Sequence, residues 1–381
     1  MCIRDSYHVG GVVLMAEKDN FNVETPLGEQ TLNLSRDLQL IGWSASQQPR
    51  PAPLTGEPFA PAFIPLLVSI SQEGDQYPFD QIRSQLTPLP NQMAIGATWN
   101  PLLSEQVGSL LGRELSALGI NMLLGPSLDV LETPHTGSAI DLGTRTFGGD
   151  PFWVGEMGSA YIQGVHTGSA GRVAVVAKHF PGHGGSDRLP EEEVSTVRKS
   201  LEQLKNFDLV PFFAATGSAA SPEATADALL VSHIRYQGFQ GNIRATTRPV
   251  SFDPQAFNAL LELEPIQNWR SEGGVMVSDN LGSRAIRRFY SLTNQEFDLP
   301  RRVALTAFLA GNDLLYIADF TSGELDAHTA AVRTLEFFAQ KYRDEPVFAQ
   351  RVDQSVLRIL TLKFKLYENF SLGLVLSPPE G

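Results

Sequence analysis

The sequence predicts an α/β fold, a TIM-type (β/α)8 barrel with one strand irregular or missing, from two observations. Short apolar runs alternate with amphipathic segments along the 381 residues, as in repeated βα units. Within the runs, polar and apolar residues do not alternate, which is typical of parallel strands that are covered on both faces. Polar residues follow many of these runs, and the carboxyl ends of barrel strands are where such folds carry their chemistry.

Seven apolar runs are expected to be strands, and each is followed within a few residues by a turn or a polar loop. The first begins close to the N-terminus, and the last follows a helix that Gly311 is expected to end. No clear eighth strand is evident, so the closure of the barrel is expected to be irregular. The expected strands are residues 9–14, 65–70, 121–124, 173–176, 228–231, 274–277 and 313–317.

Helices are expected between these strands, where apolar residues recur at helical spacing. Pro101 and Pro300 stand at first turns, where the missing N–H costs nothing, and Ser200 with Gln203 has the spacing of a capping box. Residues 1–370 are expected to form one barrel domain, and residues 371–381 a tail that begins a truncated linker. The expected helices are 32–41, 101–118, 152–166, 200–209, 300–310, 325–340 and 350–366.

The composition argues against several classes of partner. The net charge of −13 disfavours nucleic acid or an anionic membrane, and no apolar run is long enough to span a bilayer. The single Cys2 excludes a disulfide framework. Residues 1–6 lack the anatomy of a signal peptide and are expected not to be native, so the compartment stays open, as does the oligomeric state.

The stretch from Ala177 to Asp187 carries the densest chemistry in the chain. It delivers Lys178, His179 and His183 into a loop rich in Pro and Gly, directly after an apolar strand. Such a cluster at one rim indicates acid–base chemistry on a small polar ligand. The other polar residues at strand ends or in long loops are Glu73, Asp75, Asp129, Arg145, Asp187, His233 and Asp279.

Metal and cofactor sites are disfavoured by the same residues. His179 and His183 are four residues apart, but Pro181 and Gly182 prevent the helix in which this spacing would suit a metal. The loop also lacks the Gly-Lys-Ser/Thr ending of a phosphate-binding loop, and no Gly-x-Ser-x-Gly elbow occurs in the chain. We therefore expect no metal and no cofactor.

The remaining chemistry is a carboxylate nucleophile with a separate proton donor. Asp279 stands directly beyond a buried strand, which would hold the carboxylate rigidly. Structural roles stay open for three residues: a local cap for Asp279, a surface clamp with an Asp for Arg145, and a satisfied core position for His233.

Three segments together resemble family 3 glycoside hydrolases. They are Lys178 to Gly184 (Lys-His-Phe-Pro-Gly-His-Gly), Arg145 to Pro151 (Arg-Thr-Phe-Gly-Gly-Asp-Pro) and Ser278 to Leu281 (Ser-Asp-Asn-Leu). The branch that looks most similar is that of the β-N-acetylhexosaminidases, which trim cell-wall sugars. The resemblance runs from the first expected strand to about Leu366, and it implies a (β/α)8-type barrel, in agreement with the strand pattern.

The resemblance also implies residue roles and a carbohydrate substrate. Asp279 matches the catalytic nucleophile, which forms a covalent glycosyl-enzyme, and Arg145, Lys178 and His179 match residues that hold the hydroxyls of the terminal sugar. His183 is grouped with these substrate-binding residues, where it braces the turn. We expect a retaining exo-glycosidase that acts on a terminal β-linked sugar similar to N-acetylglucosamine.

Departures from the family pattern keep other functions open. The hexosaminidase branch has an Asp-x-His pair after Gly-His-Gly, whereas this chain has Asp187 without a second His, so Asp187 is the expected proton donor and His183 its rival. Ser71 stands where the family has a sugar-binding Asp, and Phe79 where it has an Arg. The alternatives are a β-glucosidase- or β-xylosidase-like enzyme, a phosphorolytic relative, or a non-catalytic sugar-binding protein.

Overall fold

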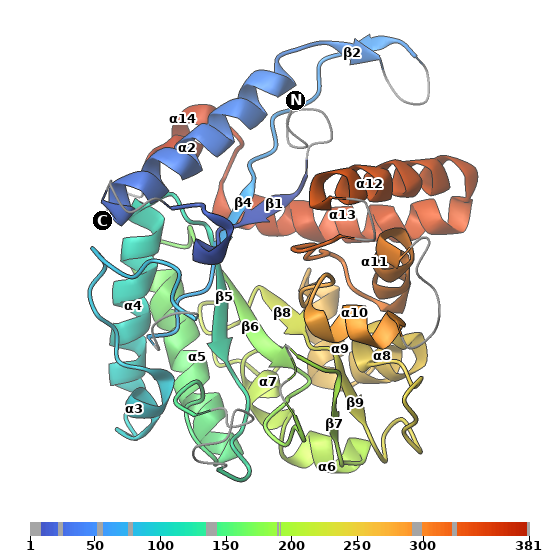
Figure 1. The fold of residues 1–381 in the computed structure, drawn as a ribbon. Helices are drawn as coiled ribbons and strands as arrows, with labels where there is room; N and C mark the ends of the chain where they lie inside the picture. The colour runs from blue at the N-terminus through green and yellow to red at the C-terminus, as the bar shows by residue number, and fades with distance from the viewer. Residues whose placement is uncertain are drawn as a thin grey trace.

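The computed structural model describes residues 9–21, 26–51, 56–74, 79–134, 143–188, 190, 192–291, 299–321 and 326–378. Its centre is a curled, all-parallel sheet of six strands in the order β1-β4-β5-β6-β8-β10, surrounded by helices (Figure 1). These strands are β1 (Gly11–Val13), β4 (Leu67–Ile70), β5 (Met122–Ser127), β6 (Ala174–Phe180), β8 (Ala228–Val231) and β10 (Val275–Ser278). The predicted α/β fold of the barrel type is confirmed, as a half-barrel.

The closure of the barrel is irregular, as the sequence predicts. The expected strand 313–317 makes a single parallel bridge, between Leu314 and Val277. Farther along, the N–H of Tyr316 turns to the Ser278 side chain instead of the β10 backbone, at 2.9 Å. Among the described residues no ladder joins this segment to β1, so the sheet stays open on that side.

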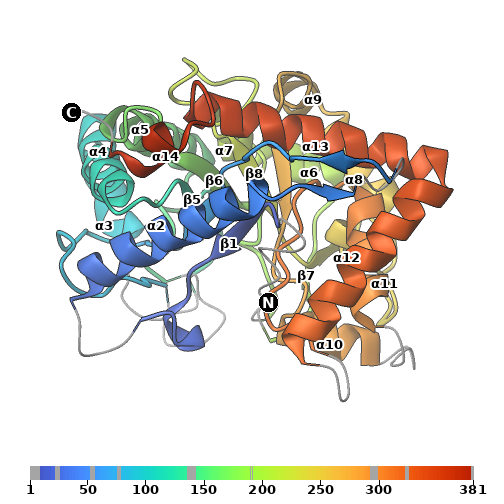
Figure 2. The same cartoon turned by 90° about the horizontal axis from the view of Figure 1, so that it is seen from above.

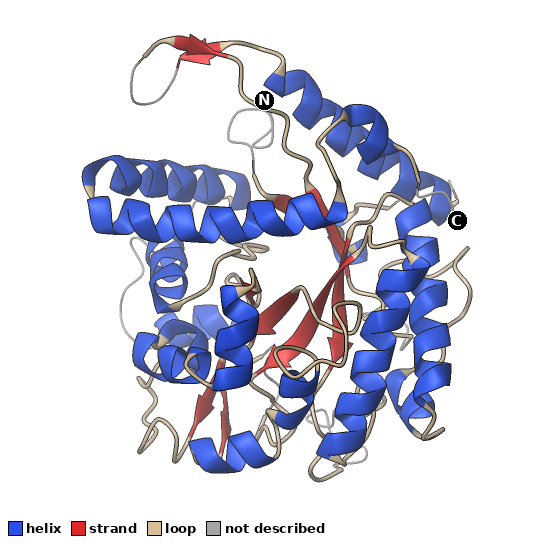
Figure 3. Ribbon diagram, turned by 180° about the vertical axis from the view of Figure 1, so that it is seen from behind, coloured by secondary structure: helices blue, strands red, loops and turns tan. Residues whose placement is uncertain are grey.

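Helices cover the outer face of the sheet on both flanks (Figure 3). On one flank α4 (Pro101–Ala117) and α5 (Pro151–Gly168) lie side by side, and on the other lie α12 (Ala327–Asp344) and α13 (Pro346–Leu366) (Figure 1). The remaining helices are α2 (Leu27–Ser46), α3 (Gln92–Gly96), α6 (Leu201–Asn206), α7 (Val210–Ala214), α8 (Pro254–Leu261), α9 (Glu264–Ser271), α10 (Arg284–Ser291), α11 (Leu299–Ala310) and α14 (Leu372–Leu376). Short pairs β2 (Arg50–Pro51) with β3 (Pro58–Phe59) and β7 (Ser195–Val197) with β9 (Ile234–Tyr236), and the 3-10 turns Ala16–Lys18 and Val250–Phe252, complete the described elements.

Local sequence explains why several helices begin and pack where they do. Ser200 and Gln203 form the expected capping box at the start of α6, with bonds of 3.3 and 2.8 Å. The close contact of α4 with α5 depends on glycine, because a Cβ at Gly108 would lie 2.2 Å from the Tyr161 carbonyl oxygen. None of the described helices is long and apolar enough to cross a membrane.

The interior of the half-barrel is lined by aliphatic side chains from the strands, such as Leu67, Met122 and Leu230, which border a cavity of about 540 Å³. The last turns of α13 close its amino-terminal end with Leu362, Leu366 and Tyr367. Helix α14 falls within the segment expected to be a tail, and it packs against α2 with Val375 buried (Figure 2). The domain boundary at residue 370 stays a prediction.

Strand β6 is longer than the sequence predicted, and this places the chemistry on the strand itself. The expected strand ended at residue 176, but the ladder continues, with Ser127 opposite Lys178 and Phe180 opposite Val231. Lys178 and His179 are therefore held by the sheet and do not lie in the following loop. The strand therefore holds both residues rigidly in place.

Candidate active site

The carboxyl edge of the sheet gathers the polar residues that follow the strands. Glu73 lies three residues beyond β4, Asp129 two beyond β5, His233 two beyond β8 and Asp279 directly beyond β10, while Lys178 and His179 belong to β6. Because all six strands are parallel, these residues share one edge. Asp75 lies outside the described residues.

Glu73 joins the two cations expected to bind substrate. Its Oε1 lies 2.5 Å from Lys178 Nζ and its Oε2 lies 2.9 Å from Arg145 Nε. Burial alone would raise the pKa of Glu73, but the charges of Lys178 and Arg145 outweigh it and hold that pKa well below its usual range. Glu73 is therefore an anion that fixes both cations, not a candidate proton donor.

The two residues that depart from the family pattern lie against these cations. The Arg145 guanidinium stacks on the Phe79 ring, 3.7 Å from its centroid. Lys178 Nζ donates to the Leu124 carbonyl at 2.9 Å and to Ser71 Oγ at 3.4 Å. The surface-clamp alternative for Arg145 gives way to a buried pairing with Glu73, and the Asp150 carboxylate caps α5 by accepting from the Trp153 N–H.

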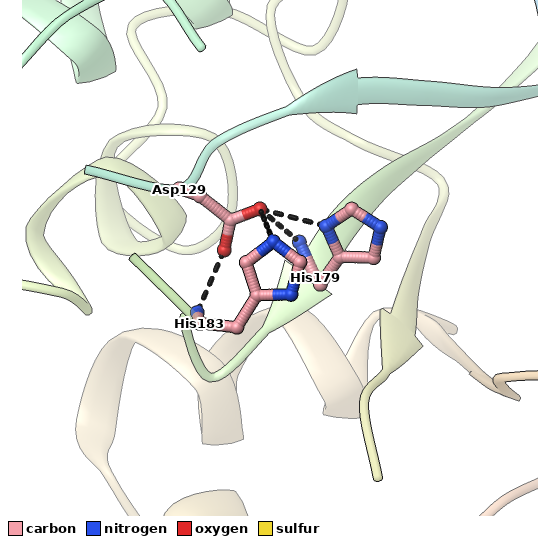
Figure 4. Close-up of side chains that lie close together, drawn as sticks. All are labelled: Asp129, His179 and His183. Atoms are coloured by element: carbon pink, nitrogen blue, oxygen red, sulfur yellow. Dashed lines mark hydrogen bonds and ion pairs between the residues drawn. The ribbon is translucent and has the colours of Figure 1, made fainter. Parts of the chain in front are cut away.

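Asp129 clamps the two histidines of the central stretch (Figure 4). Its Oδ2 lies 2.7 Å from His179 Nδ1 and 3.3 Å from His183 Nε2, and its Oδ1 accepts from the His183 backbone N–H at 2.8 Å. Burial would raise the pKa of Asp129, but His183 and His179 more than offset it and hold that pKa well below its usual range. The charged carboxylate requires Nδ1 of His179 to carry a proton, which leaves Nε2 of that ring for a ligand.

The same three residues are close enough to suggest a metal, with ligand atoms within 4.8 Å of one another. The two imidazole rings, however, are stacked with centroids 4.2 Å apart and planes inclined by only 17°. An ion bound by an imidazole lies near the plane of that ring, and two nearly parallel planes share no point close to both nitrogens. The arrangement fits a carboxylate that orients two histidines better than it fits a metal centre.

Asp279 is half-buried directly beyond the end of β10, and the buried His233 contacts its neighbour Asn280. Its backbone N–H donates to the Val231 carbonyl at 3.1 Å, and its Oδ1 accepts from the Asn280 N–H at 2.7 Å. Among the described residues nothing hydrogen-bonds to Oδ2. The local cap considered from sequence thus engages one oxygen and leaves the other for chemistry.

His233 supports this strand end from within the core. Burial lowers the pKa of His233, so the ring is neutral near pH 7, although the Asp279 charge acts in the opposite sense. A neutral ring fits its contacts, with Nε2 facing the Asn280 carbonyl at 3.2 Å and Nδ1 facing Ser251 Oγ at 2.8 Å. Its contacts are those of the structural role that the sequence left open.

Asp187, the expected proton donor, lies on the surface of its loop. Its Oδ1 accepts from the Thr196 N–H at 2.8 Å and pairs with Arg188 Nε at 3.1 Å. The end of this loop is held to α10 by an ion pair of 2.7 Å between Glu192 and Arg284. No contact between Asp187 and Asp279 is seen among the described residues.

The structure thus brings together Arg145 with Lys178, and His179 with His183, through two carboxylates that the sequence did not single out. Glu73 and Asp129 were visible only as two of several acids that follow apolar runs. Their position after an apolar run was the signal that these acids are functional, but it did not show which residue each acid would pair with. Asp279 shares their edge, whereas Asp187 stands apart.

The comparisons with known proteins agree on one family. The family model described as the glycosyl hydrolase family 3 N terminal domain matches residues 5–362. A beta-hexosaminidase A of Pseudoalteromonas piscicida is 26% identical over 373 residues, which make up 94% of this chain and 54% of that protein. A beta-hexosaminidase of Pseudomonas aeruginosa (strain LESB58) is 33% identical over 172 residues, 45% of this chain and 47% of its own length.

Solved structures give the same picture. A family 3 beta-N-acetylglucosaminidase from Paenibacillus sp. str. FPU-7 superposes with a TM-score of 0.72 at 27% identity, covering 94% of this chain and 57% of that one. M tuberculosis LpqI, at 24% identity, shares the fold with a TM-score of 0.70 over 95% of this chain and 87% of its own. The chain spans about half the length of the first curated relatives it matches.

Proposed function

Because this chain belongs to glycosyl hydrolase family 3, we propose that it is a retaining exo-glycosidase that removes a terminal β-linked sugar similar to N-acetylglucosamine. The observation that carries the proposal is the shared strand edge, on which Asp279 follows β10 while Lys178 and His179 lie near the end of β6. The names of the relatives, beta-hexosaminidase and beta-N-acetylglucosaminidase, support the choice of sugar.

In the first step Asp279 acts as the nucleophile. Its carboxylate attacks the anomeric carbon, the glycosidic C–O bond breaks, and the leaving oxygen takes a proton from a general acid. In the second step the conjugate base of that acid removes a proton from water. The water oxygen attacks the anomeric carbon and Asp279 is released, so that one water is consumed for each bond cleaved.

The sugar is held by charged donors that the buried carboxylates keep in place. In the described structure Lys178 Nζ has Glu73, Leu124 and Ser71 as partners, and the Ser71 contact at 3.4 Å is the longest of the three. A sugar hydroxyl can replace Ser71 at small cost. His179 contributes Nε2, because Asp129 occupies its Nδ1.

We propose Asp187 as the general acid. A retaining mechanism needs the acid and the nucleophile about 5–5.5 Å apart. In the described structure Asp187 is engaged with Thr196 and Arg188 and not with Asp279, so the proposal requires its loop to bring it to that separation when the sugar binds. His183 is the weaker candidate, since its ring lies under Asp129 and is buried.

A sugar-binding protein without turnover is the second candidate. It is favoured by the surface position of Asp187 and by the missing Asp-x-His pair, whereas the intact Asp279 and Lys178 oppose it.

Turnover of a panel of p-nitrophenyl β-glycosides, with and without added phosphate, tests the proposal. We expect the N-acetylglucosaminide to be the best substrate, without stimulation by phosphate. Asp279→Ala should lower kcat/KM by on the order of 10⁴-fold, whereas Asp344→Ala, which removes an exposed carboxylate of α12, should leave it unchanged. A 2-fluoro sugar should leave a covalent adduct on Asp279. Sugar binding without any turnover would favour the second candidate.

A further inference from the structure

A depression lies at the opposite end of β10 from Asp279. It has a volume of about 760 Å³ and is lined by side chains of α8, α9, α11 and α13. Arg270, Arg351 and Arg358 all face it. Arg270 lies in the last turn of α9 and donates to the Gly274 carbonyl just before β10, so this depression is at the amino-terminal end of the strand and is separate from the carboxyl edge.

The three arginines surround one buried carboxylate. Asp313 is bound by Arg270, by Arg351 Nη1 at 3.2 Å and, more loosely, by Arg358 Nη1 at 3.6 Å. Behind the depression, therefore, three positive charges meet one negative charge. The other acid that lines it, Glu262, is exposed and accepts from Asn258 Nδ2 at 2.6 Å.

The guanidinium groups differ in how many donors they have left. Arg270 and Arg351 use both terminal nitrogens on Asp313 and on backbone carbonyls of residues 274, 311 and 312. Arg358 uses only Nη1, which donates to the Gln354 carbonyl at 3.3 Å. In the part of the chain that the structure describes, its Nε and Nη2 make no hydrogen bond. That free edge is the one that grips a phosphate or carboxylate with two parallel bonds.

The electrostatics agree with an unbalanced positive charge. Burial lowers the pKa of Arg358, and the neighbouring charges of Arg270 and Arg351 lower it further, although Asp313 acts in the opposite sense. An anion placed between these groups would relieve that repulsion. Around them the depression is lined by apolar residues and by three neutral amides, Gln255, Asn258 and Gln354, whose polar groups suit the hydroxyls of a sugar.

We propose that this depression is a binding site for a phosphorylated sugar, with the phosphate on the free edge of Arg358 and the hydroxyls on the surrounding amides. The spacing Arg351, Gln354, Arg358 places all three on one face of α13, so a single rigid helix presents them. The site is independent of the hydrolytic activity, because it uses none of the residues at the carboxyl edge.

Titration calorimetry on the full chain at pH 7.5 in low salt tests the site, with glucose 6-phosphate, inorganic phosphate and glucose as probes. Glucose 6-phosphate should bind one site saturably, inorganic phosphate about tenfold more weakly, and glucose should not compete for the site. Arg358→Gln should weaken glucose 6-phosphate by at least tenfold, on the order of one lost bidentate pair. Arg343→Gln, which removes an exposed charge on α12, should bind as the wild type does.

Circular dichroism and the hydrolysis of an aryl glycoside should be unchanged in Arg358→Gln, because Arg358 is part-exposed and lies away from Asp279. Equal affinity in Arg358→Gln and the wild type would overturn the proposal, as would equal weakening in Arg343→Gln or no binding of glucose 6-phosphate at all. Inorganic phosphate binding as tightly as glucose 6-phosphate would overturn the role of the amides.

Discussion

At the scale of single residues, two buried carboxylates control the candidate site without being reactive themselves. Glu73 balances Lys178 and Arg145, and Asp129 sets the tautomer of His179. Both carboxylates have a pKa held well below the usual range, so they stay charged throughout the working range of an enzyme near neutral pH. Glu73 and Asp129 are therefore of fixed charge, and the proton has to come from elsewhere.

The proton donor is tested by the leaving group. A positioned acid is worth roughly 10²–10⁴-fold for a poor leaving group, whereas dinitrophenolate departs without protonation. Asp187→Ala should therefore spare dinitrophenyl glycosides and slow alkyl glycosides strongly, as measured by kcat/KM for both. The control is Asp344→Ala, which removes an exposed carboxylate of α12 and not the proposed acid.

Equal slowing of both substrate types in Asp187→Ala would give the residue a positioning role. An effect on neither would transfer the role of general acid to His183 or to the acidic run that contains Glu192 and Glu193. Glu191 belongs to that run and lies outside the described residues.

At the scale of elements, helix α5 is tied to the sheet by a buried ion pair. His166 lies near the end of α5, and its Nε2 is 2.8 Å from Oδ2 of Asp227, the residue that precedes β8. The same oxygen accepts from the Val175 N–H of β6 at 2.8 Å. Burial alone would lower the pKa of His166, but the charge and hydrogen bond of Asp227 raise it above its ordinary value. Burial alone would raise the pKa of Asp227, but His166 and Lys365 more than offset it and hold that pKa well below its usual range.

The pair predicts a pH-dependent stability. Asp227 contributes to the stability of the fold above its unfolded pKa of about 3.9. This contribution is lost as pH falls through its lowered folded pKa. His166 contributes its full stabilisation below its unfolded pKa of about 6.5. This stabilisation is lost as pH rises through its raised folded pKa. Asp227→Asn should therefore lower the free energy of unfolding by about 3 kcal/mol near pH 6, and by less at pH 9.

Urea unfolding at both values measures this difference, with Asp37→Asn on the exposed side of α2 as the control. A cost that does not change between pH 6 and pH 9 would show that His166 is not charged in the folded protein. The contact of Lys365 with Asp227 should matter little, because the Lys365 side chain is about half exposed to solvent.

At the scale of the whole molecule, one buried lysine joins the first strands to the last long helix. Lys363 of α13 donates to the Gly10 carbonyl at 2.8 Å and to the Pro65 carbonyl at 2.7 Å, beside the starts of β1 and β4. No carboxylate is bound to it among the described residues, and burial lowers the pKa of Lys363 to about 7. The amino-terminal end of the half-barrel is thus held by hydrogen bonds from the Lys363 amine to two backbone carbonyls. Burial disfavours the charged form of this amine.

Lys363→Met tests this cost. The unfolded lysine has a pKa of about 10.4, so between about 7 and that value the unfolded state binds more protons, and the stability of the wild type rises with pH. The methionine variant lacks this rise. Its free energy of unfolding relative to the wild type should therefore be more favourable at pH 6 than at pH 9.5, as measured by urea unfolding. A constant difference would mean that Lys363 is charged in the folded protein throughout, held by the two carbonyls.

The strands and their chemical ends were predictable because both are local properties of the sequence. An unbroken apolar run such as Val173 to Val176 identifies a covered parallel strand, and the Lys178 to Gly184 signature identifies the family without any knowledge of contacts. The capping box at Ser200 follows from a spacing of three residues. The position of the seventh strand in the sequence was predicted, but its pairing was not. The pairing is a single bridge at Leu314, which depends on how the sheet curls.

The sequence by itself determined the barrel class, the family and the residues that carry charge at the strand ends. Only the tertiary structure decided which charges meet, because Glu73 and Lys178 are 105 residues apart, and Asp129 and His179 are 50 apart. Strand order and register bring these side chains within hydrogen-bond distance, and no local pattern records a register. Burial then makes each pairing decisive, since a carboxylate removed from water stays charged only where a cation or several N–H donors replace the water.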